Sequence, residues 1–269
     1  MDAVNVQMQI LSVSPQLPYF ENEAYAVEAA RLINDLYADV VQRYPKRFAA
    51  FAATPFPHTG ASLAEAARAL DELGMVGVTV GTSVLGRSLV DPLFEPFYAE
   101  LDRRGAALYI HPVGAEASSP LISDYGLTWL IGAPIEDTIS VTHLIIKGIP
   151  VRYPHMKIIN SHLGGALPMV LQRLDNQYKW AAPDTPELPS VQARRMWYDT
   201  VGHFHAPALR CACESLGADR LLLGTDFPYL QGDLYKRSVT YIEQAGLSTS
   251  DAHQILEVNA SSLIEFDHK

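Results

Sequence analysis

The apolar residues of this chain fall into short runs that are separated by longer segments with helical spacing. Seven runs predict strands, at residues 5–13, 47–55, 76–82, 106–112, 156–162, 196–200 and 220–226. Between them apolar residues recur every three or four positions, which predicts helices over residues 22–45, 60–75, 91–105 and 134–154. The strand runs are apolar almost throughout, and this is typical of strands that are buried on both faces of a parallel sheet.

Such an alternation of strands and helices predicts an α/β fold with right-handed crossovers. Two architectures fit the pattern: a doubly wound open sheet and a (β/α)8 TIM-like barrel, for which seven strands is one too few. No internal repeat marks a boundary along the chain. The Pro-rich segment 180–190 is a loop by composition, so we expect residues 1–269 to form a single domain.

Charge and composition narrow the range of partners. A formal net charge of −10 argues against nucleic acid or an anionic membrane surface as a partner. No apolar run reaches the roughly 18 residues of a membrane-spanning helix. The two cysteines, Cys211 and Cys213, would point to different faces of a helix, so we expect no disulfide between them. Since the N-terminus does not resemble a signal peptide, we expect a cytoplasmic protein.

Three polar residues stand at the ends of predicted strands, each followed by Pro, Gly or a turn. They are His111 in "YIHP", His162 in "NSHLGG" and Asp226 in "GTDFP". In parallel α/β folds the chemistry lies at the carboxyl ends of the strands. Each residue alone could be a hydrogen-bonded structural group, but together they predict a site, and imidazole with carboxylate suits a divalent transition metal.

Four further polar residues follow predicted strands and have less definite roles. Asp199 is expected to hydrogen-bond a histidine of the site. His203 and His205 form a His-x-His pair after another strand, and either the site or the solvent accounts for them equally well. His58, beyond the second strand, is one more candidate ligand.

Several segments, taken in their order and spacing, resemble one known family over almost the whole chain. They include "YIHP", "TWLIGAPIEDT", "RYPHMKIINSHLGGALPMVLQRLD", "WYDT" and "GADRLLLGTDFPY". The chain resembles the amidohydrolase superfamily (amidohydrolase-related, family 2), specifically its metal-dependent decarboxylases of the α-amino-β-carboxymuconate-ε-semialdehyde decarboxylase type. This resemblance implies a distorted (β/α)8 barrel and one divalent metal ion, usually zinc, with manganese as the alternative.

The resemblance also implies roles for individual residues. His111 and Asp226 would be metal ligands, and Asp226 would also shuttle a proton. His162 would be the catalytic acid/base beside the metal. Trp129 matches an aromatic residue near the substrate. Arg173 matches an arginine that binds the substrate carboxylate in a neighbouring subunit, which implies a homodimer.

The chain departs from the family pattern in two places. Leu163 stands where the family has the first glycine of His-Gly-Gly-Gly, and a leucine there could narrow the space beside the imidazole. The family's His-x-His motif, which ends its first strand and carries two metal ligands, is absent. We therefore expect the chain to begin just before the family's second strand, and metal occupancy is open because a catalytic zinc usually has about three protein ligands.

The sequence thus predicts a non-oxidative, metal-dependent decarboxylase that acts on a small unsaturated or aromatic carboxylic acid. A metal-dependent hydrolase of a lactone, ester or amide would use the same residues. An inactive family member is the third possibility, because of the missing His-x-His motif. A serine hydrolase and a dinucleotide enzyme are disfavoured, since the chain has neither a Gly-x-Ser-x-Gly elbow nor a Gly-x-Gly-x-x-Gly turn.

Overall fold

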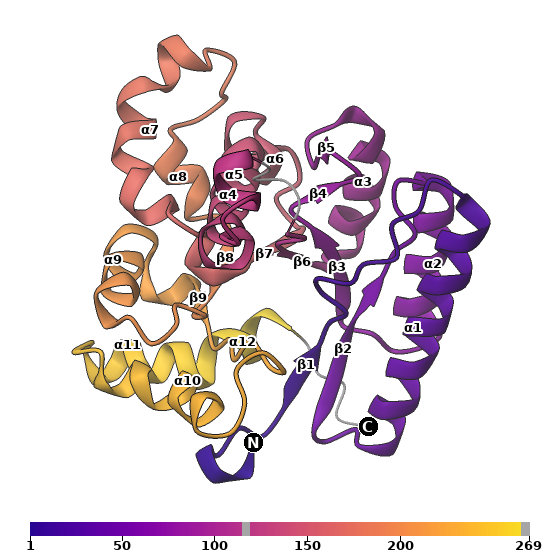
Figure 1. Cartoon of the computed structure of the whole chain (residues 1–269), viewed down its shortest axis with the longest axis horizontal. Coiled ribbons are helices and arrows are strands. Elements are labelled where there is room, and N and C mark those ends of the chain that lie inside the picture. The colour runs from indigo at the N-terminus through magenta and orange to yellow at the C-terminus, as the bar shows by residue number, and fades with distance from the viewer. Residues whose placement is uncertain (115–118, 265–269) are drawn as a thin grey trace.

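In the computed structural model, which describes residues 1–114 and 119–264, parallel strands curl into a half-barrel (Figure 1). Among the described residues its seven strands are β1 (Gln9–Leu11), β2 (Phe48–Ala53), β3 (Gly77–Gly81), β6 (Ala107–His111), β7 (Lys157–Asn160), β8 (Trp197–Asp199) and β9 (Leu221–Leu222). Every strand pairs in parallel with the next along the chain, in the order β1-β2-β3-β6-β7-β8-β9. A doubly wound sheet reverses its order midway, so the TIM-like alternative is the one that holds.

Helices connect the strands of the sheet, and most of them cover its convex side (Figure 1). They are α1 (Glu23–Arg43), α2 (Thr59–Asp71), α3 (Glu95–Arg104), α4 (Pro120–Ser123), α5 (Ala133–Ile146), α6 (Ile149–Arg152), α7 (Leu167–Ala181), α8 (Pro189–Ala193), α9 (Ala206–Leu216), α10 (Asp233–Gln244), α11 (Thr249–His253) and α12 (Asn259–Leu263). A short antiparallel hairpin, β4 (Ser83–Val84) with β5 (Arg87–Ser88), follows β3. Within the described ranges, no helix has both the length and the hydropathy to cross a membrane.

One predicted helix is two helices in the structure. The pattern over residues 134–154 predicts a single segment, whereas α5 ends at Ile146 and α6 begins at Ile149. Gly148 lies between them with φ of 65°, a left-handed conformation that glycine adopts without strain. The break therefore comes from a glycine inside an otherwise continuous apolar pattern.

The alternation of side chains along each strand divides the core into two clusters. On the convex face, Ala52, Val80 and Ile110 pack with buried residues of the surrounding helices. On the concave face, Phe51, Ala107, Ile159 and Leu222 pack with Leu263, the last residue of α12, and with Ile264. Because successive side chains of a strand alternate, His111 shares the concave face of β6 with Ala107. The end of β6 thus directs an imidazole into the half-barrel.

The first and last strands of the order face each other across an opening in the curled sheet. In the described part of the chain no backbone ladder joins β9 to β1. Side chains bridge this region instead: Tyr235 Oη donates to Gln9 Oε1 at 3.2 Å, and Gln16 Nε2 donates to Tyr229 Oη at 3.3 Å. The barrel wall is therefore continuous from β1 to β9, and in the described residues side-chain hydrogen bonds, not a strand ladder, join the region of β1 to the segments after β9.

Candidate metal centre

The three strand-end residues meet at one point of the half-barrel. One ligand atom from each of His111, His162 and Asp226 lies within 4.8 Å of the other two. The described residues contain no other such group of three or more histidine, cysteine or acidic side chains. Two ligands of one ion at about 2.1 Å can be at most about 4.2 Å apart, so small side-chain shifts would bring these donors to a common cation.

His111 presents one ring nitrogen to this point. It is the last residue of β6 and is 8% exposed. Its Nδ1 lies 2.9 Å from the carbonyl oxygen of Pro112 and donates to it, which leaves Nε2 free for the cluster. Burial, and then the neighbouring His162, lowers the pKa of His111 to about 3. The ring is therefore neutral, as a metal ligand must be.

The backbone around His162 is held in an unusual conformation. His162 has φ of 52° and Leu163 has φ of 59°, both in the left-handed region. The Asp199 carboxylate at the end of β8 holds this turn, because its Oδ1 accepts from the backbone N–H of His162 at 2.8 Å. The same oxygen accepts from the N–H of Val201 at 3.0 Å. Asp199 thus bonds a site histidine, as expected, but through its backbone rather than its ring.

The glycines after His162 are required by close packing. A Cβ at Gly165 would clash with the carbonyl oxygen of Pro134 and with the Thr138 side chain. Gly165 also has φ of 66°. The side chain of Leu163 is 4% exposed, belongs to the larger core cluster and lies against Gly202.

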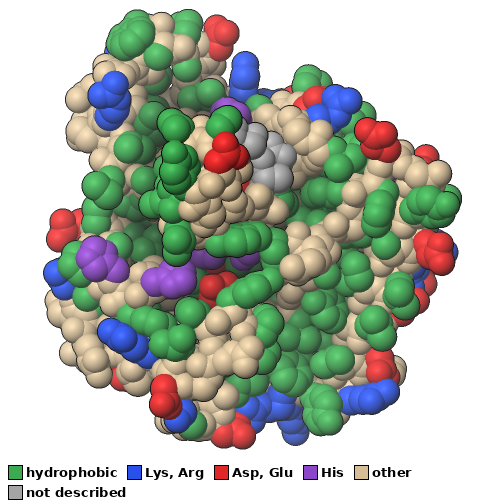
Figure 2. Space-filling model, viewed as in Figure 1, with side chains coloured by type: hydrophobic (Ala, Val, Ile, Leu, Met, Phe, Trp, Pro, Cys, Tyr) green, Lys and Arg blue, Asp and Glu red, His purple; other side chains and the backbone are tan. Residues whose placement is uncertain are grey.

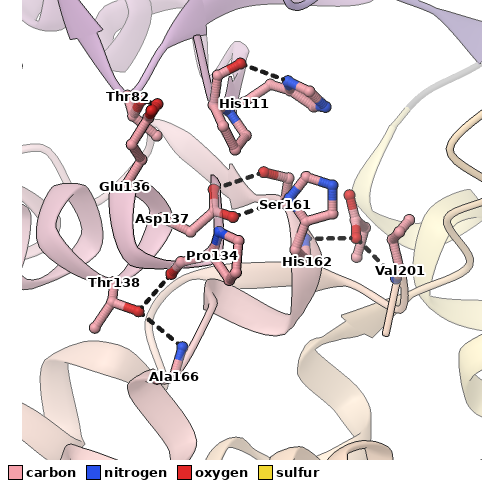
Figure 3. A network of polar contacts seen from close by, with 12 residues as sticks. Thr82, His111, Pro134, Glu136, Asp137, Thr138, Ser161, His162, Ala166 and Val201 are labelled. Carbon is pink, nitrogen blue, oxygen red and sulfur yellow. Dashed lines mark hydrogen bonds and ion pairs between the residues drawn. The ribbon is translucent and has the colours of Figure 1, made fainter. Parts of the chain in front are cut away.

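The His162 ring is paired with an acid that the sequence analysis did not single out. Its Nδ1 lies 2.9 Å from Oδ2 of Asp137, and Ser161 Oγ donates to Oδ1 of the same carboxylate at 2.9 Å (Figure 3). Burial alone lowers the pKa of His162, but the pair with Asp137 and two further carboxylates outweigh it and raise the pKa to about 9. The only sequence signal for this acid was a pair of acidic residues near the start of a predicted apolar helix, "APIEDTIS".

Asp226 completes the cluster from the loop after β9. It is half-buried and has φ of 54°. Burial raises the pKa of this carboxyl group, and the nearby His162 opposes that shift. A divalent cation at the cluster would favour the ionised form.

A second buried acid fixes the loop after β6. Glu136 Oε2 accepts from Thr82 Oγ1 at 3.0 Å and from the backbone N–H groups of Val113 at 2.9 Å and Gly114 at 3.1 Å. Trp129, which lies just before α5, packs against this loop: a Cβ at Gly114 would fall 2.7 Å from its indole carbons. The indole is 56% exposed, so part of it is available to a ligand.

The remaining candidates lie outside the three-residue cluster. His58 Nε2 lies 2.9 Å from the carbonyl oxygen of Phe20, beside α1. His203 and His205 are exposed in the loop between β8 and α9. Arg173 is exposed on α7 and forms no ion pair with any described residue. The structure thus brings together His111, His162 and Asp226, and not these four.

Comparison with known proteins agrees with this geometry. The profile of the family described as Amidohydrolase matches residues 1–266. The 2-amino-3-carboxymuconate-6-semialdehyde decarboxylase of Dictyostelium discoideum is 32% identical over 239 residues, which cover 86% of this chain and 65% of that protein. The chain thus spans less than two thirds of that relative. The gamma-resorcylate decarboxylase of Polaromonas sp. strain JS666 is 30% identical over 284 residues, covering 99% of this chain and 86% of the relative.

A solved structure extends the comparison to the metal. A dihydroxybenzoic acid decarboxylase of Polaromonas sp. JS666, with bound manganese and the inhibitor 2-nitroresorcinol, superposes with a TM-score of 0.87 at 28% identity. The match covers 98% of this chain and 83% of that one. The resemblance to the decarboxylase branch is therefore confirmed, and these three relatives are named as decarboxylases, as expected for a carboxy-lyase.

Proposed function

The chain belongs to the amidohydrolase family, and we propose that it is a metal-dependent, non-oxidative decarboxylase of an unsaturated or aromatic carboxylic acid. The observation that carries this proposal is the convergence of His111, His162 and Asp226 within 4.8 Å at the ends of three strands. Decarboxylase relatives that match most of the chain support the reaction class. One core cluster that runs from β2 to the helices after β9 supports a single domain.

His111 and Asp226 would hold the divalent ion. A neutral imidazole and a carboxylate suit both zinc and manganese, and a manganese-containing neighbour supports the second. When bound, the cation supplies a Lewis acid that stabilises the electron-rich oxygen of the substrate. The two ligands leave coordination positions for other donors.

His162 supplies the proton. Its Nδ1 is held by Asp137, so Nε2 is the nitrogen that can give a proton to the carbon that loses its carboxylate. The electron pair of the broken carbon–carbon bond forms the new C–H bond, and carbon dioxide leaves. Solvent then returns the proton to the ring. The pKa of about 9 favours a protonated ring before this step.

Trp129 and Arg173 would recognise the substrate. The half-exposed indole of Trp129 offers an apolar face for an unsaturated or aromatic body. Arg173 is exposed on α7 without an ionic partner in the described chain, so its guanidinium is available to a carboxylate in a second copy. This role requires a homodimer.

An apolar surface beside the site supports that homodimer. Figure 2 shows hydrophobic side chains gathered over α4 and α5. They are 38–74% exposed and comprise Leu121, Tyr125, Trp129, Leu130, Ile131, Ile135 and Ile139. Large apolar patches of this kind mark interaction sites. Replacement of Leu130 by Asp would give a monomer in sedimentation equilibrium, whereas an unchanged dimer would place the interface elsewhere.

An eighth strand between β9 and β1 completes the proposed barrel. The unpaired edges of β1 and β9 in the described chain support it. In the family that strand carries the His-x-His ligands. Metal content of the chain, compared with that of a chain extended by its upstream reading frame, tests this point. Equal content in both would argue against ligands from such a strand.

The decisive experiment measures metal and carbon dioxide together. The purified protein is analysed for zinc and manganese, then incubated with dihydroxybenzoates and carboxymuconate semialdehydes while CO2 is recorded. Metal at one equivalent with CO2 release supports the decarboxylase. Hydrolysis of lactones or esters without CO2 release would make the protein a hydrolase, and absence of metal and turnover would make it an inactive family member.

A further inference from the structure

The buried carboxylate of Asp137 contacts the ring of His162. Asp137 lies on α5, one residue after Glu136, and is 3% exposed. Figure 3 shows its carboxylate directed toward Ser161 and His162. Oδ1 accepts from Ser161 Oγ and Oδ2 accepts from His162 Nδ1, each at 2.9 Å. Both oxygens are therefore used, which is what a buried carboxylate requires.

His162 is fixed by two carboxylates that act on different parts of it. Asp199 accepts from its backbone N–H at 2.8 Å and so holds the left-handed turn. Asp137 accepts from the ring and so sets the ring orientation. These two contacts come from β8 and α5, which are separate elements of the fold. The orientation of the imidazole is thus determined independently of the backbone that carries it.

We infer that Asp137 is the positioning residue of the acid/base: it holds His162 as the tautomer protonated on Nδ1 and directs Nε2 at the His111–Asp226 cluster. This inference rests on the proposed role of His162. A carboxylate next to one ring nitrogen can only accept, so the proton on Nδ1 is retained there. Nε2 is then the atom that exchanges the proton with the substrate, while the Nδ1 proton stays between His162 and Asp137.

The first test is Asp137→Asn, which keeps the size of the side chain and its contact with Ser161. Its amide NH2 can donate to Nδ1, so that the ring shifts to the tautomer protonated on Nε2. We expect kcat to fall by about 10- to 100-fold, with KM and metal content within about threefold of the wild type. A kcat equal to that of the wild type would overturn the inference.

The second test does not depend on turnover. Two-bond ¹H–¹⁵N spectra of the histidine-labelled protein, recorded at one fixed pH above the pKa of His162 so that its ring is neutral, report which ring nitrogen carries the proton. His162→Gln identifies the signal. The wild type is expected to show a proton on Nδ1, and Asp137→Asn is expected to change that pattern. An identical pattern in both proteins would show that Asp137 does not set the tautomer.

Glu136→Gln is the matched control. Glu136 is the adjacent acid of the same helical turn, is 2% exposed and accepts from Thr82 and the loop after β6. Its variant is expected to leave the His162 pattern unchanged. A change equal to that of Asp137→Asn would mean that loss of any buried acid in this turn disturbs the ring. If the wild type releases no CO2, the proposed function fails, while the spectra still decide the role of Asp137.

Discussion

The imidazole rings of His111 and His162 lie edge to face, with their centroids 5.1 Å apart and their planes at 62°. Each ring has its Nδ1 engaged by a fixed oxygen, Pro112 O for His111 and Asp137 Oδ2 for His162. The two Nε2 atoms are therefore the free nitrogens of both rings. The neighbouring strands β6 and β7 thus direct two free ring nitrogens toward one small volume beside Asp226.

Removal of the metal should stop turnover without unfolding the protein. The ligands lie at the strand ends, whereas the core clusters are built from apolar residues of the sheet and helices. Dialysis against dipicolinate is expected to abolish CO2 release and to leave the far-ultraviolet circular dichroism unchanged. Addition of manganese or zinc should restore turnover. Full turnover in the metal-free protein would contradict a role for the cation.

His162→Gln should separate chemistry from metal binding. Loss of a general acid typically lowers kcat by about 10²- to 10⁴-fold. Metal content is expected to stay near that of the wild type, because His111 and Asp226 remain. Parallel kinetic and elemental analysis checks both parts. Wild-type activity in this variant would remove His162 from the mechanism.

Asp226→Ala should reduce metal content and activity together, since it removes one of two proposed ligands. Asp184→Ala is the matched control, because Asp184 is an exposed acid in the loop before α8. Elemental analysis is expected to show a loss only for Asp226→Ala. Equal metal content in both variants would rule out Asp226 as a ligand.

Mixing two inactive variants tests whether Arg173 acts across a dimer. His162→Gln and Arg173→Ala each inactivate a homodimer. In a mixed dimer one site combines an intact His162 with the partner copy's intact arginine, so random exchange should recover about a quarter of wild-type turnover, given twofold symmetry. No recovery after exchange, verified by native mass spectrometry, would place Arg173 in the same subunit as the site it serves.

Replacement of Leu163 by glycine and by alanine should lower the free energy of unfolding in an unusual order. Removal of a buried leucine side chain lowers the free energy of unfolding by about 2–5 kcal/mol. In ordinary positions glycine is a further 0.5–1 kcal/mol or so less stable than alanine. At φ of 59° alanine is strained and glycine is not. Urea unfolding of the metal-free proteins is therefore expected to find Leu163→Gly at least as stable as Leu163→Ala, and a clearly weaker glycine variant would contradict this.

Strand positions were readable from the sequence because burial on both faces leaves continuous apolar runs. All seven observed strands lie inside the predicted ranges, from Gln9–Leu11 to Leu221–Leu222. Each is shorter than predicted, because the apolar pattern continues into flanking residues that do not pair in the sheet. The split at Gly148 and the β4–β5 hairpin were not predicted, because one glycine and two-residue strands leave little periodic signal.

The three cluster residues were predictable because each ends or closely follows a strand, and the carboxyl ends of the strands share one rim of the sheet. Asp137 was not predictable by this reasoning. It stands on a helix, beside another acid, and does not follow a strand. Only the packing of α5 against the turn after β7 turns it toward His162. Helix-borne partners of a strand-end group depend on tertiary contacts that no local pattern encodes.

The positive φ angles of His162 and Asp226 have a consequence for the selection of thermostable variants of this protein. A residue other than glycine in that conformation is less stable by about 1–2 kcal/mol, and two of the residues that adopt it, His162 at 52° and Asp226 at 54°, are ones proposed to react. Glycine or asparagine at position 226 would relax the metal-free fold and raise its melting temperature. Screens that select for a high melting temperature alone will therefore enrich for variants that have lost catalytic activity.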